Sequence, residues 1–242
     1  MCWSGTRFIS LHLTAIRFQS DYYQFTMKVI SLLALPGLAY AAVQGFDISN
    51  WQPNVDYQGA YDSGARFVMI KATEGTGYTD PTFSKHYTGA TNAGLIRGGY
   101  HFARPSSSSG SAQATYFLAH GGGWSADGIT LPGMLDLEAG CYGLSASAMV
   151  SWIEDFGETY KAKAGRYPMI YTTTSWWTQC TGNHGGFGEY PLVLARWGSS
   201  VGTLPNGWST HSFWQNSDSY EFGGDSEVWN GSEANLKTFA SK

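Results

Sequence analysis

Short apolar runs alternate with amphipathic segments from residue 43 to about residue 175 of this 242-residue chain. The apolar runs at 43–49, 66–75, 95–104, 129–139 and 167–175 predict strands. The segments at 55–65, 80–94, 109–122 and 145–165 predict helices, since they carry helix-start residues, helical apolar spacing or a closing glycine. Beyond residue 175 the helical pattern fades, and strands are predicted at 190–197, 211–217 and 226–231, joined by glycine-rich loops.

Alternation of strands and helices is typical of a parallel sheet, and this pattern indicates the α/β class. We expect a single TIM-like barrel of about five βα units followed by three strands with few helices. Neither a linker nor a change of composition divides residues 42–242, so we assign them to one domain.

Polar residues stand where the predicted strands end. They are Asp47, Glu74, His101, Arg104, Asp136, Glu138, Tyr171, Thr172, Arg196 and Trp197, with Gln215 on the seventh strand. In a parallel barrel the carboxyl ends of all strands meet at one face, and that face carries the chemistry. The pattern therefore predicts a catalytic mouth lined by these side chains.

Two acids one residue apart, Asp136 and Glu138, interrupt the apolar run "LPGMLDLEAG". Successive strand residues point to opposite faces, so both acids should project inward while Leu135 and Leu137 face the helices. Their Cα atoms would lie roughly 6.6 Å apart, and their carboxyl groups could approach to about 5 Å, the spacing of retaining glycosidases. We expect the two acids to be buried together, with a proton on Glu138 and a charge on Asp136.

The composition favours a carbohydrate ligand. The chain has 10 Trp and 15 Tyr, and aromatic residues make up 16% of it. Aromatic faces stack on the apolar faces of sugars, although a large aromatic core would need the same residues. The net charge is −4 and no basic block occurs, which argues against nucleic acid and membranes as partners.

The N-terminal 41 residues are read as two segments outside the domain. Residues 27–41, "MKVISLLALPGLAYA", have a lysine, a short apolar run and a small-x-small cleavage signal, and predict a secretory signal peptide. Residues 1–26 are interpreted as an upstream extension. We therefore expect a secreted, extracellular protein. Two cysteines then remain, Cys141 and Cys180, and an oxidising compartment favours a disulfide between them over two free buried thiols.

Five motifs in series resemble the family 25 glycoside hydrolases, the lysozymes or N-acetylmuramidases of the Chalaropsis type. They are "GFDISNWQ", "FVMIKATEG", "GGYHFARP", "MLDLE" and "FWQNS", and they span most of residues 42–242 in order. The resemblance implies a secreted, fungal-like lysozyme that hydrolyses the β-1,4 bond between N-acetylmuramic acid and N-acetylglucosamine in bacterial peptidoglycan. It also implies a monomer that needs no cofactor and no metal.

The resemblance assigns roles to particular residues. Glu138 matches the proton donor and Asp136 the second acid of the pair, while Asp47 and, on a shorter motif, Asp225 match further catalytic acids. Positions that line the sugar groove are matched by Tyr100, Phe102, Tyr171, Trp197 and Gln215. Separately, the sequon "NGS" makes Asn230 a candidate glycosylation site.

Three alternative interpretations concern particular residues of this chain. A chitinase-like hydrolase also uses a strand-borne D-x-E, but its pattern has a further Asp where this chain has Met134. A catalytically weak glycan-binding protein on the same barrel would not need Asp47, Asp136 and Glu138 intact. Cys180 and His184 suggest metal ligands, although no second pair of ligands accompanies them.

Overall fold

The computed structural model describes residues 42–242. The predicted signal peptide at 27–41 and the upstream extension at 1–26 lie outside the described residues. Across the described part, no helix combines the length and the apolar character needed to cross a membrane.

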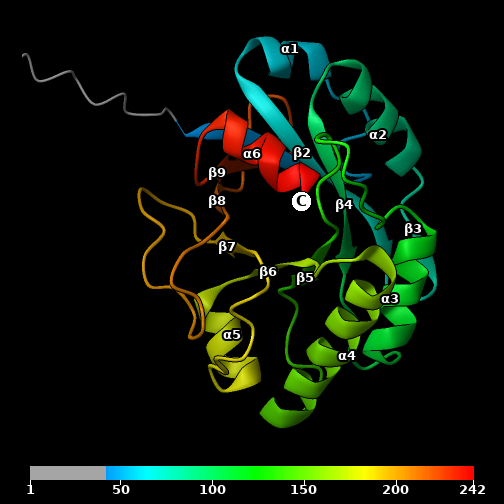
Figure 1. The fold of residues 1–242 in the computed structure, drawn as a ribbon, viewed down its shortest axis with the longest axis vertical. Helices are drawn as coiled ribbons and strands as arrows, with labels where there is room; N and C mark the ends of the chain where they lie inside the picture. The colour runs from blue at the N-terminus through cyan, green and yellow to red at the C-terminus, as the bar shows by residue number, and fades with distance from the viewer. Residues whose placement is uncertain (1–41) are drawn as a thin grey trace, which may run out of the picture. The chain divides into compact units, whose positions relative to one another are not determined.

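Eight strands close into a barrel, and a short ninth strand pairs only with β2 (Figure 1). They are β1 (Val43–Ile48), β2 (Ala65–Glu74), β3 (Tyr78–Thr79), β4 (Ile96–Phe102), β5 (Met134–Leu137), β6 (Met169–Thr172), β7 (Leu192–Ala195), β8 (Phe213–Ser217) and β9 (Asp225–Trp229). Pairing is parallel from β1 through β2, β4, β5, β6 and β7 to β8. Strand β9 runs antiparallel to both β8 and β1 and so completes the ring.

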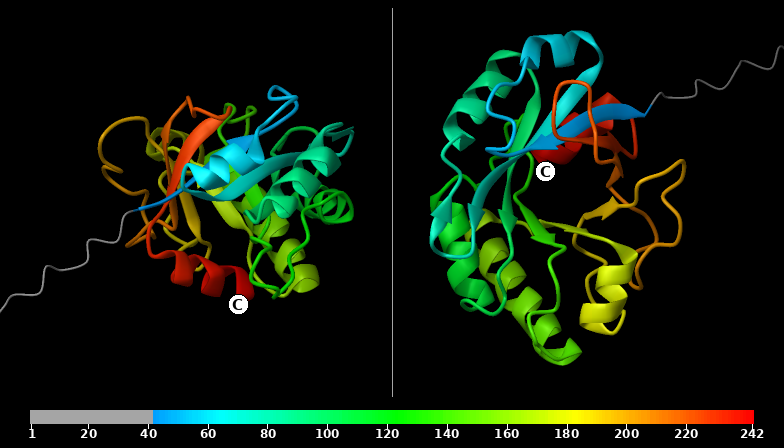
Figure 2. Two further views of the ribbon diagram at one scale, coloured as in Figure 1. Left: turned by 90° about the horizontal axis from the view of Figure 1, so that it is seen from above. Right: turned by 180° about the vertical axis from the view of Figure 1, so that it is seen from behind.

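The helices follow the first five barrel strands and then stop until the C-terminus. They are α1 (Tyr57–Asp62), α2 (Phe83–Asn92), α3 (Gly110–Ala119), α4 (Ala146–Ala164), α5 (Thr174–Thr181) and α6 (Glu233–Ser241). Figures 1 and 2 show α1 to α4 along one side of the barrel, whereas loops cover β7 and β8. The prediction of a TIM-like barrel with five βα units and three trailing strands is confirmed.

Two helices lie where the sequence pattern indicated none. Helix α5 follows the fifth barrel strand as a segment of eight residues, too short to show a clear helical period. Thr173 begins it by accepting a hydrogen bond from the backbone N–H of Trp176, and Gly182 ends it in the left-handed conformation at φ 68°. Helix α6 follows β9 after a Ser232 cap.

Three apolar clusters hold the barrel together. One lies between strands β4 to β7 and helices α3, α4 and α5, and a second lies between β1, β2 and helices α1 and α2. The third fills the barrel interior near the amino ends of the parallel strands, where Leu236 and Ala240 of α6 join Phe67 and Phe213. Helix α6 therefore seals the end of the barrel opposite the carboxyl ends of the strands.

A disulfide links Cys141, three residues after Glu138, to Cys180 on α5, with their Cα atoms 5.1 Å apart. The predicted pairing is confirmed. The bond ties the loop that follows β5 to the helix that follows β6, at the carboxyl ends of two neighbouring strands.

The double substitution Cys141→Ala and Cys180→Ala should lower the free energy of unfolding by about 4 kcal/mol, because the linked residues are 39 positions apart and the open chain regains that loop's entropy. Urea unfolding of residues 42–242 measures the difference. The reduced parent protein should match the variant, and equal stability of oxidised parent and variant would contradict the expectation.

Candidate active site

Carboxyl groups from three strands converge on one pocket at the mouth of the barrel. Its lining residues are Asp47, Tyr100, Met134, Asp136, Glu138, Tyr171, Gln215 and Asp225. Seven of these eight are the residues that sequence analysis placed at the site, and Met134 is the addition. The pocket lies where the carboxyl ends of the parallel strands meet, as the barrel pattern predicted.

The inward direction of Asp136 follows from the alternation of β5. Leu135 and Leu137 are buried in the cluster shared with α4, so Asp136 between them faces the barrel interior. Asp136 is only 6% exposed. Glu138, in contrast, is exposed, because β5 ends at Leu137 and Glu138 stands on the rim. The expectation that both acids are buried together is therefore wrong for Glu138.

Gln215 on β8 links four side chains across the mouth. Its amide nitrogen donates to Oδ2 of Asp47 at 2.9 Å and to Oδ2 of Asp225 at 3.2 Å. Its amide oxygen accepts from the Tyr171 hydroxyl and from the Trp197 indole nitrogen, both at 3.0 Å. Since Gln215 is buried and fully engaged, it fixes the relative positions of two acids and two aromatic rings.

A glycine turn brings Asp225 to Asp47. The two residues face each other in the antiparallel pairing of β9 with β1. Gly224 precedes Asp225 with φ 75°, and a Cβ at Gly224 would stand 1.8 Å from the backbone oxygen of Asp47. Only glycine allows β9 to begin this close to β1, so the short "GGD" stretch has a structural cause.

Burial and mutual repulsion raise the pKa of the paired acids unequally. For Asp136, burial is the main cause and the carboxyls of Glu138 and Asp47 add to it, so its pKa is raised well above the ordinary value. For Glu138, partial burial and Asp225 raise the pKa. Lys71 opposes both shifts. Burial thus favours a proton on Asp136 in the free protein, whereas the sequence argument left Asp136 ionised.

Asp47 titrates near neutrality in this setting. Burial and the neighbouring Asp225 raise its pKa from 3.8 to about 7, although hydrogen bonds from Gln215 and Glu227 oppose the shift. Burial also raises the pKa of Tyr100 and of Tyr171 far above the usual range, so both hydroxyls stay protonated and serve as donors.

A second pocket adjoins the first and extends the site outward. It is lined by Glu138, Tyr171, Thr173, Ala195, Arg196, Trp197 and Gln215. Three of these residues also line the first pocket, so the two form one continuous groove. Trp197 is 60% exposed, and a ring left open to solvent at the wall of a groove suits stacking on a sugar.

Phe102 lies at the opposite side of the mouth and lines neither pocket. Its ring is flanked by the Lys71 ammonium at 4.8 Å and the Arg104 guanidinium at 4.7 Å from the ring centre. Glu74 binds the same two cations, to Lys71 at 2.7 Å and to Arg104 at 2.5 Å. These ion pairs lower the pKa of Glu74 and keep its carboxylate ionised. Glu74 therefore has a structural role, although it stands at the end of a strand.

His101 points away from the mouth. Its ring is fully buried between the strands and the helices, with Nδ1 at 2.7 Å from the Thr73 hydroxyl and Nε2 at 2.9 Å from the Gln113 side-chain oxygen. Burial lowers the pKa of His101 to about 4, so the ring is neutral near pH 7. Its place at a strand end therefore does not bring His101 into the mouth, and the residue is a hydrogen-bonded part of the wall.

Sequence analysis missed one acid, Glu227 on β9. Its side chain is completely buried, and it faces the barrel interior between Asp225 and Trp229, two residues to either side. The alternation of "DSEVW" contained this signal, since Asp225 and Glu227 must share a face in a strand.

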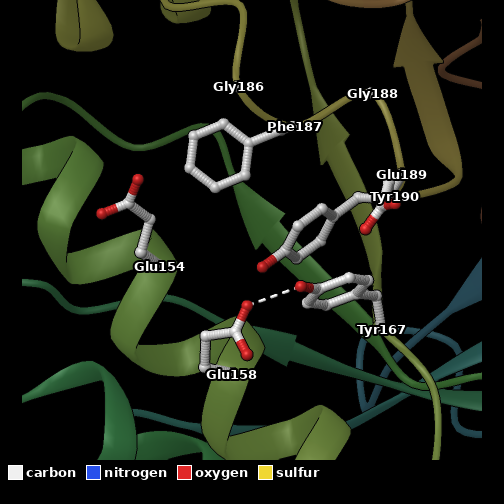
Figure 3. Close-up of a pocket in the computed structure, with 8 residues that line it drawn as sticks. All are labelled: Glu154, Glu158, Tyr167, Gly186, Phe187, Gly188, Glu189 and Tyr190. Carbon is white, nitrogen blue, oxygen red and sulfur yellow. Dashed lines mark hydrogen bonds between the residues drawn. The ribbon is translucent and has the colours of Figure 1, made fainter.

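Another acidic pocket lies away from the mouth, between α4 and the loop before β7 (Figure 3). Glu154, Glu158 and Glu189 line it, with Tyr167 and Tyr190 stacked at a centroid distance of 4.1 Å. Tyr167 and Tyr190 precede β6 and β7, so this pocket opens at the amino ends of the strands. It therefore offers acids for control substitutions outside the candidate site.

Two further expectations concern a metal ion and a glycan. Within residues 42–242 no group of three or more His, Cys, Asp or Glu side chains could hold a metal ion, and the disulfide removes Cys180 as a ligand. Asn230 is exposed, and its side-chain nitrogen donates to Thr210 at 3.1 Å and to the His211 carbonyl at 3.0 Å. Glycosylation of Asn230 stays a prediction.

Asp47→Asn should stabilise the protein increasingly as the pH rises from 4 to 7. Because the pKa of Asp47 is raised to about 7, the folded parent protein keeps a proton between pH 4 and pH 7 that the unfolded chain releases. The free energy of unfolding of the parent therefore falls as the pH rises through this range. Asparagine has no proton to lose, so the gain should reach up to about 4 kcal/mol near neutral pH. Urea unfolding at a series of pH values measures it.

The matched control is Asp62→Asn on α1, an exposed aspartate outside the cluster. It should change the unfolding free energy by less than about 0.5 kcal/mol at every pH. A stability difference between parent and Asp47→Asn that does not vary with pH would contradict the interpretation.

Comparison with known proteins agrees with this geometry. Residues 46–225 match the family described as glycosyl hydrolases family 25. The chain is 59% identical over 208 residues to an N,O-diacetylmuramidase of Chalaropsis sp, covering 82% of this chain and 99% of the relative. It is 58% identical over 231 residues to an N,O-diacetylmuramidase of Arthroderma benhamiae, covering 88% and 98%. A solved muramidase structure from Trichobolus zukalii superposes with a TM-score of 0.82 at 65% identity, over 83% of this chain and 99% of the other. The chain belongs to the glycosyl hydrolases of family 25.

Proposed function

We propose that this chain is a lysozyme, a muramidase that hydrolyses the β-1,4 bond between N-acetylmuramic acid and N-acetylglucosamine in bacterial peptidoglycan. The observation that carries the proposal is the cluster of Asp47, Asp136 and Glu138 in one open pocket at the barrel mouth. The names of the fungal relatives and of the solved muramidase structure support the same substrate. The catalytic unit is residues 42–242, acting as a monomer.

Glu138 is the proton donor in this proposal. It stands exposed on the rim, where a glycosidic oxygen can reach it, and partial burial together with Asp225 raises its pKa. A carboxyl group with a raised pKa keeps its proton closer to neutral pH and can donate it as the bond breaks. The same carboxylate then takes a proton from the water that completes hydrolysis, which returns the site to its first state.

Asp136 acts on the positive charge that develops at the anomeric carbon. It lies below Glu138 inside the pocket, and its Oδ1 has no hydrogen-bond partner among residues 42–242, so this oxygen is free to meet a sugar. Asp136 must be ionised at that moment, and the nearby ammonium of Lys71 favours the ionised form. It either attacks the anomeric carbon or orients the substrate's N-acetyl group for attack, and both routes retain the anomeric configuration.

Asp47 and Asp225 supply negative charge across the pocket from β5. Gln215 holds both carboxylates, and its other hydrogen bonds hold Tyr171 and Trp197 along the groove. We assign Tyr100, Phe102, Tyr171, Trp197 and Gln215 to substrate binding. Charge placed beforehand around the reacting carbon needs no reorganisation during the reaction.

Two finer points of the proposal concern the substrate and the compartment. Two relatives are named N,O-diacetylmuramidase, and we extend to this chain their acceptance of muramic acid that carries an O-acetyl group. We also propose that the protein is secreted, which is supported by the apolar run at 27–41 and by the disulfide between Cys141 and Cys180.

Digestion of purified peptidoglycan should release fragments whose new reducing ends are N-acetylmuramic acid. The expected products follow from cleavage of the muramic acid–glucosamine bond, and mass analysis after borohydride reduction identifies the sugar at each new end. New ends of N-acetylglucosamine, or cleavage of peptide bonds alone, would contradict the proposal, and so would fragments from chitin at a comparable rate.

Glu138→Gln should lower kcat on peptidoglycan by a factor of roughly 10² to 10⁴, the usual range for loss of a general acid. Asp136→Asn should be similarly impaired, and Asp47→Asn less so because Asp47 acts through its charge. Turnover is measured by clearing of a cell-wall suspension, with circular dichroism to establish folding.

The control for these substitutions is Glu154→Gln, the same chemical change in the pocket of Figure 3. It should leave turnover within about twofold of the parent. A folded Glu138→Gln protein that keeps more than about a tenth of the parent activity would disprove the assignment of Glu138.

A further inference from the structure

Glu227 is a buried acid that the reaction described above does not use. Its side chain has an exposed fraction of 0%, and β9 places it opposite Gly45 of β1 and opposite Gln215 of β8. One step nearer the mouth, Asp225 of the same strand faces Asp47 of β1. Glu227 therefore lies directly beneath the Asp47–Asp225 pair.

Ordinary hydrogen-bond donors do not reach this side chain. Within residues 42–242, no N–H or hydroxyl group donates to either carboxyl oxygen of Glu227. In the strand register, the nearest acid on the neighbouring strand β1 is Asp47, two residues beyond Gly45 and toward the mouth. An ionised carboxylate without a donor is extremely costly to bury, and here it would also face a second carboxylate.

The direction of the titration agrees with this geometry. Burial is the main cause that raises the pKa of Glu227 well above its ordinary value, and Asp47 and Asp225 raise it further. The hydrogen bond between the two groups acts in opposite directions on them, since it raises the pKa of Glu227 and lowers that of Asp47. Gln215 donates to Asp47, whereas within residues 42–242 no group donates to Glu227, so the shared proton belongs on Glu227 and Asp47 is the acceptor.

We propose that Glu227 is a positioning residue, whose protonated carboxyl donates a hydrogen bond to Asp47 from inside the barrel and stabilises the ionised form of Asp47 beneath the substrate. The inference deepens the proposed function and rests on it. With Gln215 donating to Oδ2 at 2.9 Å, Asp47 has two donors, one from β8 and one from β9. A carboxylate with two fixed donors keeps its charge among neighbouring acids.

The groups that face this pair are nearly all acids or tyrosines. They are Asp225 on β9, Asp136 and Glu138 at β5, Tyr100 on β4 and Tyr171 on β6. Lys71 on β2 acts on Asp136 and Glu138. The acids destabilise a charge on Asp47, and a neutral donor beneath it opposes their effect.

Two substitutions separate the donor from the space it fills. Glu227→Gln keeps the size and an N–H donor but cannot titrate, whereas Glu227→Met keeps a similar volume and has no donor. The readout is the pH profile of kcat/KM on peptidoglycan. The acid limb should move upward by about one pH unit in Glu227→Met, because a hydrogen bond to a charged group contributes about that much to a carboxyl titration.

Glu227→Gln should keep the acid limb within about 0.3 pH units and the activity within about tenfold. In the Asp47→Asn background, Glu227→Met should cause no further shift, because the acceptor charge is already gone. A folded Glu227→Met protein with the parent's pH profile would overturn the proposal in favour of simple filling of space, and so would a profile shifted equally in both variants.

One measurement needs neither activity nor the methionine variant. The infrared difference spectrum between parent and Glu227→Gln at pH 7 should show the C=O band of one protonated carboxyl that the variant lacks. Absence of that band would overturn the proposal even if Glu227→Met failed to fold. This result is independent of Glu138→Gln and of the peptidoglycan products, so failure of the proposed function and failure of this inference are distinguishable.

Discussion

Five carboxyl groups share the carboxyl-terminal end of the barrel, and burial raises the pKa of each. They are Asp47, Asp136, Glu138, Asp225 and Glu227. Taking such groups out of water and placing them side by side costs several kcal/mol, which the apolar clusters of the barrel must offset. The arrangement around them follows from this cost. Gln215 donates to two of the acids, Lys71 faces two others, and the deepest one keeps its proton.

The same cost accounts for the many cross-links around the pocket. Gln215 has its donors and acceptors engaged with groups from β1, β6 and β9 and from the loop after β7. The Lys71–Glu74–Arg104 ion pairs and the disulfide of Cys141 brace the loops on either side of β5. A site that keeps like charges close must be held by rigid neighbours, since any slack would let the acids separate and lose their perturbed titration.

Much of this fold and site could be predicted from the sequence because parallel strands bring their carboxyl ends together. Asp47, Asp136, Tyr171 and Gln215, which the sequence places on or at the ends of strands, line one pocket. Other features depend on tertiary contacts that no local pattern reveals. Glu138 stands on the rim because β5 ends at Leu137, two residues before the end of the strand predicted at 129–139.

The residues that were misread or missed share a physical cause. Glu74 stands at the end of a strand, as the acids of the site do, but it forms ion pairs with Lys71 and Arg104. Glu227 lies in a short C-terminal strand whose sequence does not show which strand it pairs with. The closure of the barrel pairs β9 with β1 and places Glu227 under Asp47. Helix α6 was missed because it is short, and its buried residues Leu236 and Ala240 find apolar partners only at the end of the closed barrel.

The pairing of β9 with β1 has a consequence for how the chain reaches its native state. Asp47 and Asp225 are paired neighbours in the sheet, although they lie near opposite ends of the domain in sequence. The ring therefore cannot close until the last strand has been synthesised. Such long-range contacts make folding slow, and a nascent chain remains open while its carboxyl end is still in the ribosome. Asp47 and Asp225 thus come together only when the ring closes, in the last step of barrel assembly.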